Sequence, residues 1–186
     1  FPFPHEQAAG AYIALGLLAI WLSRRHLAQV ARSVLGLPGG ADESREPLSY
    51  RAAFLVLVVC FACLIVMGMI LGASWPVMFF FFLIFFLYSL AIARMRAELG
   101  PPAHDLHAMG PEVLIQHAVG VHRLGPGNIT TFSLFFWFNR AYRAHISAHS
   151  MEGFKIGQLT RTTSRSILVA MVIAVVFGAA TALWAM

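Results

Sequence analysis

The feature that most constrains the fold is a long run without charge. Residues 52–93 contain no Asp, Glu, Lys or Arg, and a Gly-Ala-Ser-Trp-Pro turn signal falls at 72–76. The stretches on either side of this signal, 52–72 and 76–93, each reach about 18 apolar residues or more, which is the length typical of a transmembrane helix. The run therefore predicts two membrane-spanning helices joined as a tight hairpin.

Two further stretches extend this interpretation to the whole chain. Residues 166–186 are long enough to span a bilayer, and residues 7–23 are uncharged but close to the short limit. Hydrophobic residues make up 59% of the chain and charged residues 11%, against roughly 25% charged in soluble domains. The sequence predicts an all-α polytopic membrane protein forming one domain over 1–186, with four spans at about 7–23, 52–72, 76–99 and 166–186.

The basic residues predict the orientation of these spans. All 13 Lys and Arg fall in two zones, 24–51 and 94–165. Because Lys and Arg concentrate in short cytoplasmic loops, both zones are expected inside the cell and both termini outside. The loops 24–51 and 100–165 are thus predicted to be cytoplasmic. The net charge of +5 is explained by topology and contact with the lipid bilayer, and no basic groove with spaced aromatic residues indicates nucleic-acid binding.

Local signals place two helix ends in the water-exposed parts. Residues 24–35 alternate apolar and basic faces at helical spacing, which predicts an amphipathic helix on the membrane surface that stops at Gly36. The third span is expected to continue as a helix through an Arg94–Glu98 pair, to end at Gly100, and to be prevented from resuming by Pro101 and Pro102.

The segment after the third span is unusual for a loop. Gly110 and Pro111 are expected to start a short helix with Glu112 at its positive end. A second helix is predicted over 128–147 with Asn128 as its N-cap, and its apolar part covers about half of a membrane crossing. Three interpretations of 128–147 remain open: a re-entrant half-helix, an amphipathic helix on the cytoplasmic face, or a fifth span.

Polar residues cluster on both sides of this segment. The candidate substrate-binding residues are His104, Asp105, His107, Asn139, Arg140 and Arg143. Guanidinium groups suit bidentate binding of a carboxylate, so we expect Arg140 or Arg143 to face the protein interior. Its partner would be an anionic solute or one of the four acids in this zone, which are Glu98, Asp105, Glu112 and Glu152.

A metal site is the competing interpretation of the histidines. His104, His107, His145 and His149 carry imidazoles that transition metals bind, and the last two are four residues apart. The spacing is loose and no HExxH motif occurs, so no metal, cofactor or catalytic residue is expected.

Three segments carry a resemblance to a known family. "RAELGPPAHDLHAMGPE", "FFWFNRAYRAH" and "EGFKIGQL" are similar to segments of an uncharacterised bacterial domain family found in large multi-spanning membrane proteins. The similarity covers nearly the whole chain. It implies an inner (plasma) membrane location and additional spans, so that this chain would be a C-terminal part of a longer protein.

That family in turn resembles the oligopeptide transporter superfamily, which moves peptides or metal chelates. The superfamily has an acidic-x-Lys-x-Gly-x-Leu element before a helix, and Lys155, Gly157 and Leu159 match it. Glu152 departs from the pattern because it lies three residues before the lysine instead of two.

The sequence and the resemblance together favour part of a transporter for small anionic or peptide-like solutes or metal chelates. Its partners would be the bilayer and either the remaining spans of a longer chain or neighbouring membrane subunits. A structural subunit of a membrane complex is the first alternative. A membrane metalloenzyme that uses the four histidines is the second.

Overall fold

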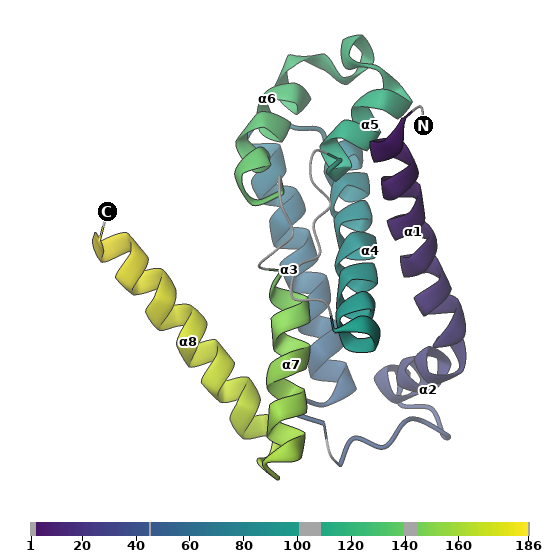
Figure 1. Cartoon of the computed structure of the whole chain (residues 1–186), viewed down its shortest axis with the longest axis vertical. Helices are drawn as coiled ribbons and strands as arrows, with labels where there is room; N and C mark the ends of the chain where they lie inside the picture. The colour runs from purple at the N-terminus through teal and green to yellow at the C-terminus, as the bar shows by residue number, and fades with distance from the viewer. Residues whose placement is uncertain (1–2, 45, 101–108, 140–144, 186) are drawn as a thin grey trace.

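The computed structural model describes residues 3–44, 46–100, 109–139 and 145–185 (Figure 1). Within these ranges the chain forms helices and no strand, as the sequence predicts. The helices are α1 (Pro4–Leu22), α2 (Arg24–Leu35), α3 (Tyr50–Ile70), α4 (Trp75–Leu99), α5 (Pro111–Val119), α6 (Val121–Asn139), α7 (Ile146–Leu159) and α8 (Ser164–Ala185).

Three of these helices are long and apolar enough to cross a bilayer, namely α3, α4 and α8. The helix pair α1 and α2 meets the same criterion only when taken together, and it bends by 65° between them. The described residues therefore provide three to four candidate spans, which confirms the predicted all-α membrane architecture. Gly36 and Gly100 end α2 and α4 in the left-handed backbone region, as predicted, with φ of 74° and 63°.

The hairpin of α3 and α4 forms the centre of the bundle. The chain turns at Gly72, whose φ of 101° favours glycine, and Pro76 lies in the first turn of α4. The α4 helix is largely buried because α1, α3, α5 and α7 all pack against it. The α3 and α8 helices keep most of their apolar side chains exposed, as helices that contact lipid or further helices do.

Close packing of α1 on α4 depends on small and aromatic residues. Gly16 lies directly against the backbone of Leu87, and a Cβ on Gly16 would come within 2.7 Å of the Leu87 carbonyl oxygen. One helical turn from Gly16, the ring of Tyr12 in α1 meets the ring of Tyr88 in α4 edge to face, with centroids 6.2 Å apart. Ala9 of α1 and Tyr88 and Ile92 of α4 belong to one buried cluster, which also includes Met109 and Ala148 of α7.

The two ends of the hairpin differ in what covers them. We call the end with residues 72–75 the turn end, and the end with α2 and Arg94–Glu98 the basic end. Figure 1 shows α5 and α6 at the turn end, beside the N-terminus. There Asn128 Oδ1 accepts a hydrogen bond of 2.8 Å from the backbone N–H of Ser74, and Thr131 Oγ1 donates to the carbonyl oxygen of Leu71 at 3.2 Å.

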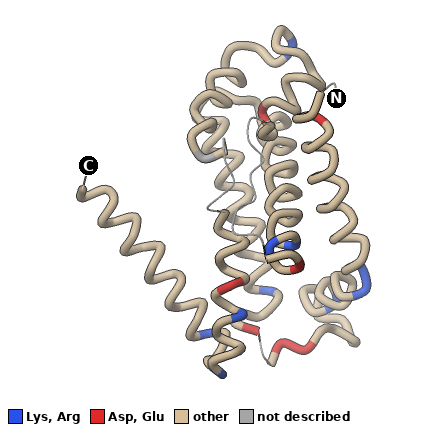
Figure 2. The backbone as a smooth tube through the Cα atoms, in the orientation of Figure 1, with Lys and Arg blue, Asp and Glu red and all other residues tan. Residues whose placement is uncertain are grey.

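These contacts correct the prediction that 100–165 forms one loop on the basic side. Residues 111–131 lie at the turn end, whereas α7 returns to the basic end (Figure 1). A helix of the length of α4 extends about 35 Å, so the two ends are a bilayer thickness apart. The prediction failed because it used the position of the basic residues alone. Arg123 belongs to α6, and Figure 2 shows a basic position among the segments at the turn end.

The prediction that Asn128 caps the second helix is also wrong. The α6 helix begins at Val121, and its backbone is broken at Gly125, where φ is 76° and ψ is 164°. Pro126 follows the break and restarts the helix, so Asn128 lies inside it. The Asn128 amide instead bonds Ser74, the N-cap of α4, and donates to the Leu124 carbonyl across the break at 2.6 Å.

The last two helices form a second hairpin at the basic end. The α7 helix packs along α4, and α8 then turns back and extends away from the bundle (Figure 1). Gly153 and Gly157 of α7 allow the close approach of Met171 and Ile167 of α8. The start of α8 is thus attached to α7 by small residues, as is common where membrane helices meet.

Candidate functional site

The structure describes one of the six predicted substrate-binding residues, Asn139. The other five, His104, Asp105, His107, Arg140 and Arg143, lie outside the described residues. Asn139 is the last residue of α6 and is fully buried. Its surroundings identify a polar site within an otherwise apolar region.

The partner of Asn139 is Glu112, in the first turn of α5. The Asn139 amide nitrogen donates a hydrogen bond to a carboxylate oxygen of Glu112, and the Glu112 residue is only 5% exposed. A buried carboxylate is expensive unless it is paired, and here the amide and the positive start of α5 both stabilise its charge. From the sequence, Glu112 is predicted only as a helix-start acid and a partner for Arg140 or Arg143, and the predicted binding residues do not include it.

The backbone before Glu112 is shaped for this contact. Gly110 is the N-cap of α5, and Pro111 occupies its first turn as predicted. A Cβ on Gly110 would meet both the Asn139 amide and the Glu112 carboxylate. The φ of Gly110, −69°, is open to any residue, so a side chain at this position would act by displacing these two polar groups from their present places.

Burial also changes the acidity of Glu112. Removal from water raises the pKa of the Glu112 carboxyl above its ordinary value, while hydrogen bonds from the backbone and from Asn139 act in the opposite direction. The carboxyl therefore takes up a proton at a higher pH than an exposed glutamate does.

A cavity of about 270 Å³ lies beside this pair, between α5 and α6. Its lining combines three polar and three apolar side chains: Glu112, Gln116, Ser133, Val113, Phe132 and Phe136. Phe132 belongs to the buried aromatic core of the turn end, where it stacks on Phe81 with ring centroids 5.7 Å apart. One side of the cavity is thus formed by a buried ring of the core, that of Phe132, whereas Phe136 is exposed.

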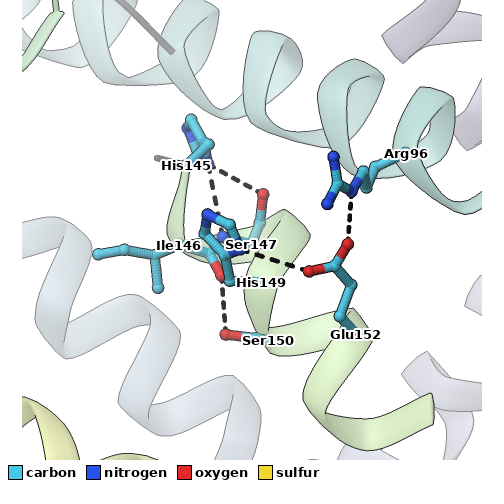
Figure 3. A network of polar contacts seen from close by, with 7 residues as sticks. All are labelled: Arg96, His145, Ile146, Ser147, His149, Ser150 and Glu152. Carbon is cyan, nitrogen blue, oxygen red and sulfur yellow. Dashed lines mark hydrogen bonds and ion pairs between the residues drawn. The ribbon is translucent and has the colours of Figure 1, made fainter. Parts of the chain in front are cut away.

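A second polar network links α4 to α7 (Figure 3). Arg96 of α4 donates to Glu152 of α7 at 2.5 Å, and Glu152 also lies 3.4 Å from the Nδ1 atom of His149. Through its contact with Arg96, Glu152 attaches α7 to α4. The guanidinium is the main reason why the pKa of the Glu152 carboxyl lies below its ordinary value.

The two described histidines of the candidate metal site, His145 and His149, contact different residues. The His145 imidazole packs on Phe85, with ring centroids 5.5 Å apart, and lies 3.0 Å from the Ser147 hydroxyl. The His149 imidazole contacts Glu152 instead (Figure 3). Within the described ranges no group of three His, Cys, Asp or Glu side chains is close enough to hold a metal ion, and His104 and His107 lie outside them.

The acids expected to pair with Arg140 or Arg143 have other partners where they are described. Glu98 pairs with Arg94 at 2.9 Å, which confirms the predicted contact within α4. Glu152 pairs with Arg96, and Glu112 with Asn139. Asp105 and both arginines lie outside the described residues, so the predicted arginine contact stays a prediction.

The Arg96–Glu152 ion pair should make the stability of the fold depend on pH in the acid range. The folded-state pKa of Glu152 is depressed, so its contribution is present above the ordinary carboxyl pKa and is lost as the pH falls through the lowered value. The difference in melting temperature between the protein and Glu152→Gln should therefore be constant near neutral pH and shrink below the ordinary carboxyl range. Thermal unfolding at a series of pH values measures it.

The matched control is Glu98→Gln, which removes an acid whose partner lies within the same helix. An i,i+4 pair on a helix surface is worth only a few tenths of a kcal/mol, so this variant should show a smaller difference. A Glu152→Gln difference that persists far below the carboxyl range would exclude the ion pair as its cause.

Comparison with known proteins relates the whole chain to one family. The profile of a family described as a family of unknown function (DUF6785) matches residues 1–186. No curated protein and no solved structure matches the chain.

Proposed function

The chain belongs to this family of unknown function, DUF6785, and we propose that it forms part of a membrane transporter for small peptide-like or anionic solutes or metal chelates. The apolar helices make it an integral membrane protein. The observation that carries the step to transport is the buried Glu112–Asn139 pair, which joins the short helix α5 to the broken helix α6 beside a cavity.

Interrupted helices are the usual framework of transport sites. Secondary transporters bind solutes and coupling ions where helices break, because the ends of the broken helices present polar backbone groups to a cavity. Here α5 starts at Gly110, and the backbone breaks again at Gly120 and Gly125. An ionisable residue buried in such a region is costly to the fold and is typically retained for function.

The distribution of charge supports the orientation predicted from the sequence, with one exception. Nine of the described basic residues belong to the segments at the basic end, which are α2, the ends of α3 and α4, α7 and the start of α8 (Figure 2). They are Arg24, Arg25, Arg32, Arg51, Arg94, Arg96, Lys155, Arg161 and Arg165. Only Arg123, among the described Lys and Arg, belongs to the turn end. We propose that the basic end faces the cytoplasm of a bacterial cell and that both termini face outward.

The resemblance to the oligopeptide transporter superfamily is consistent with this proposal. Lys155, Gly157 and Leu159 all belong to α7, and Gly157 is the residue that lets α8 approach. A small residue at this point has a packing function in the α7–α8 hairpin. The kinship itself stays part of the proposal.

Solute-dependent current is the direct test. The purified protein is reconstituted into liposomes, adsorbed on a solid-supported membrane, and exposed to concentration jumps of dialanine, trialanine or ferric citrate. We expect a transient current with at least one of these solutes, absent from empty liposomes and strongly reduced in Glu112→Gln. The control Glu98→Gln should retain the current, because Glu98 lies at the basic end, away from the cavity.

A structural role is the competing outcome, and one observation favours it. The α3 and α8 helices expose long apolar faces, which neighbouring subunits could cover as well as lipid. Folded, reconstituted protein that gives no current with any solute, and that purifies in fixed ratio with other membrane proteins, would replace the transporter proposal with this one.

A further inference from the structure

We propose that the cavity between α5 and α6 binds the primary ammonium group of a small solute, with Glu112, Gln116 and Ser133 as its three hydrogen-bond acceptors. The role of this site in substrate recognition rests on the proposed transport function, whereas its ability to bind an amine does not. The inference adds a chemical class of ligand, an alkylammonium headgroup, and three residues that are not among the binding residues predicted from the sequence.

The number and placement of acceptors fit an ammonium group. A primary ammonium has three N–H donors and no acceptor. Glu112 and Gln116 are four residues apart on α5 and so lie on one face of that helix, while Ser133 faces the cavity from α6. The Ser133 hydroxyl donates to the Ile129 carbonyl at 3.1 Å, so its own oxygen remains available to accept.

The charge of the lining selects a cation. Among the described residues, six line the cavity, and Glu112 is the single ionisable one of these six. The partners that stabilise its carboxylate, the Asn139 amide and the start of α5, carry only partial charges. A bound ammonium would supply a full opposite charge and a charge-assisted hydrogen bond, which is stronger than a neutral one.

The apolar lining fits the same ligand. Phe132 and Phe136 contribute aromatic rings, and cations are attracted to the faces of such rings. A volume of about 270 Å³ is small for a ligand pocket, so it suits an amino-acid-sized headgroup better than an entire peptide. A quaternary ammonium would satisfy the aromatic rings but leave the three acceptors without donors.

The test is binding of ethylammonium chloride to the purified protein, with sodium chloride and tetramethylammonium chloride at equal ionic strength as reference salts. Ligand that binds only the folded state raises the melting temperature in proportion to the logarithm of its concentration once the site is saturated. We expect ethylammonium to raise it and both reference salts to leave it unchanged. In Glu112→Gln the affinity should fall by about tenfold or more, because the charge is lost while the shape is kept.

Two further variants keep the test decisive if Glu112→Gln does not fold. Ser133→Ala and Gln116→Leu each remove one acceptor and should each weaken ethylammonium binding several-fold, since one hydrogen bond to a charged group is lost. Glu98→Gln should bind as the unchanged protein does. Equal stabilisation by ethylammonium and tetramethylammonium, or equal ethylammonium affinity in all variants, would overturn the proposal.

This experiment separates the ammonium site from the transport function. Ethylammonium binding without solute-dependent current would leave the site in place and remove the transporter proposal. Solute-dependent current in a protein that does not bind ethylammonium would support the transporter proposal and overturn the ammonium site.

Discussion

Replacing Gly16 by alanine should destabilise the protein by roughly 1–3 kcal/mol, the usual penalty for overpacking a close contact. The added Cβ would lie 2.7 Å from the Leu87 carbonyl oxygen, which belongs to the backbone of α4 and cannot rotate away. Accommodation requires α1 to move off α4, which would disturb the buried cluster around Tyr88 and Ala9. Thermal or denaturant unfolding of the purified protein measures the change.

The same helix provides the control. A Cβ on Gly10 meets nothing within 4 Å. Since alanine is favoured over glycine in a helix by up to about 1 kcal/mol, Gly10→Ala should leave stability unchanged or increase it. If the two variants behave alike, α1 does not pack on α4 through Gly16, and the helical arrangement at this interface is wrong.

The second large effect is expected at Asn139. Asn139→Leu keeps a side chain of similar size but removes the amide that donates to Glu112, so the buried carboxylate loses its partner. Leaving a buried charged group unsatisfied costs about 1–3 kcal/mol or more. The variant should therefore unfold at a clearly lower temperature or denaturant concentration than the unchanged protein.

A double-mutant cycle separates this contact from a general packing defect. Glu112→Leu removes the charge, and in that background Asn139→Leu should cost less, giving a coupling of roughly 0.5–3 kcal/mol. Ser133→Ala serves as the control, since Ser133 bonds within its own helix. Additive effects of the Glu112 and Asn139 substitutions would show that the hydrogen bond does not stabilise the fold.

Local chemistry explains which features could be read from the sequence. The spans and the α3–α4 hairpin follow from the charge-free run 52–93, because a bilayer core selects apolar helices of a set length whatever their neighbours are. The helix ends at Gly36 and Gly100 and the start at Pro111 follow from backbone preferences of single residues. The Arg94–Glu98 pair follows from helical spacing.

Positions relative to other helices could not be read in this way. Which end of the hairpin is covered by 111–131 depends on a contact between Asn128 and Ser74, which are far apart in sequence. Asn128 was expected to be a helix N-cap, because asparagine before an apolar run most often has that position. Its amide bonds a different helix only because the break at Gly125 brings it there.

The candidate site shows the same division most clearly. The sequence alone determined that Asn139 follows the apolar part of a predicted helix and that Glu112 begins a short helix, because both properties are local. Only the tertiary structure decided that these two residues, 27 positions apart, bond each other next to a cavity. A carboxylate can be satisfied by an amide, a guanidinium, a helix start or water, and sequence spacing does not distinguish among them. Packing of α5 and α6 brings the Asn139 amide to the Glu112 carboxylate at the start of α5.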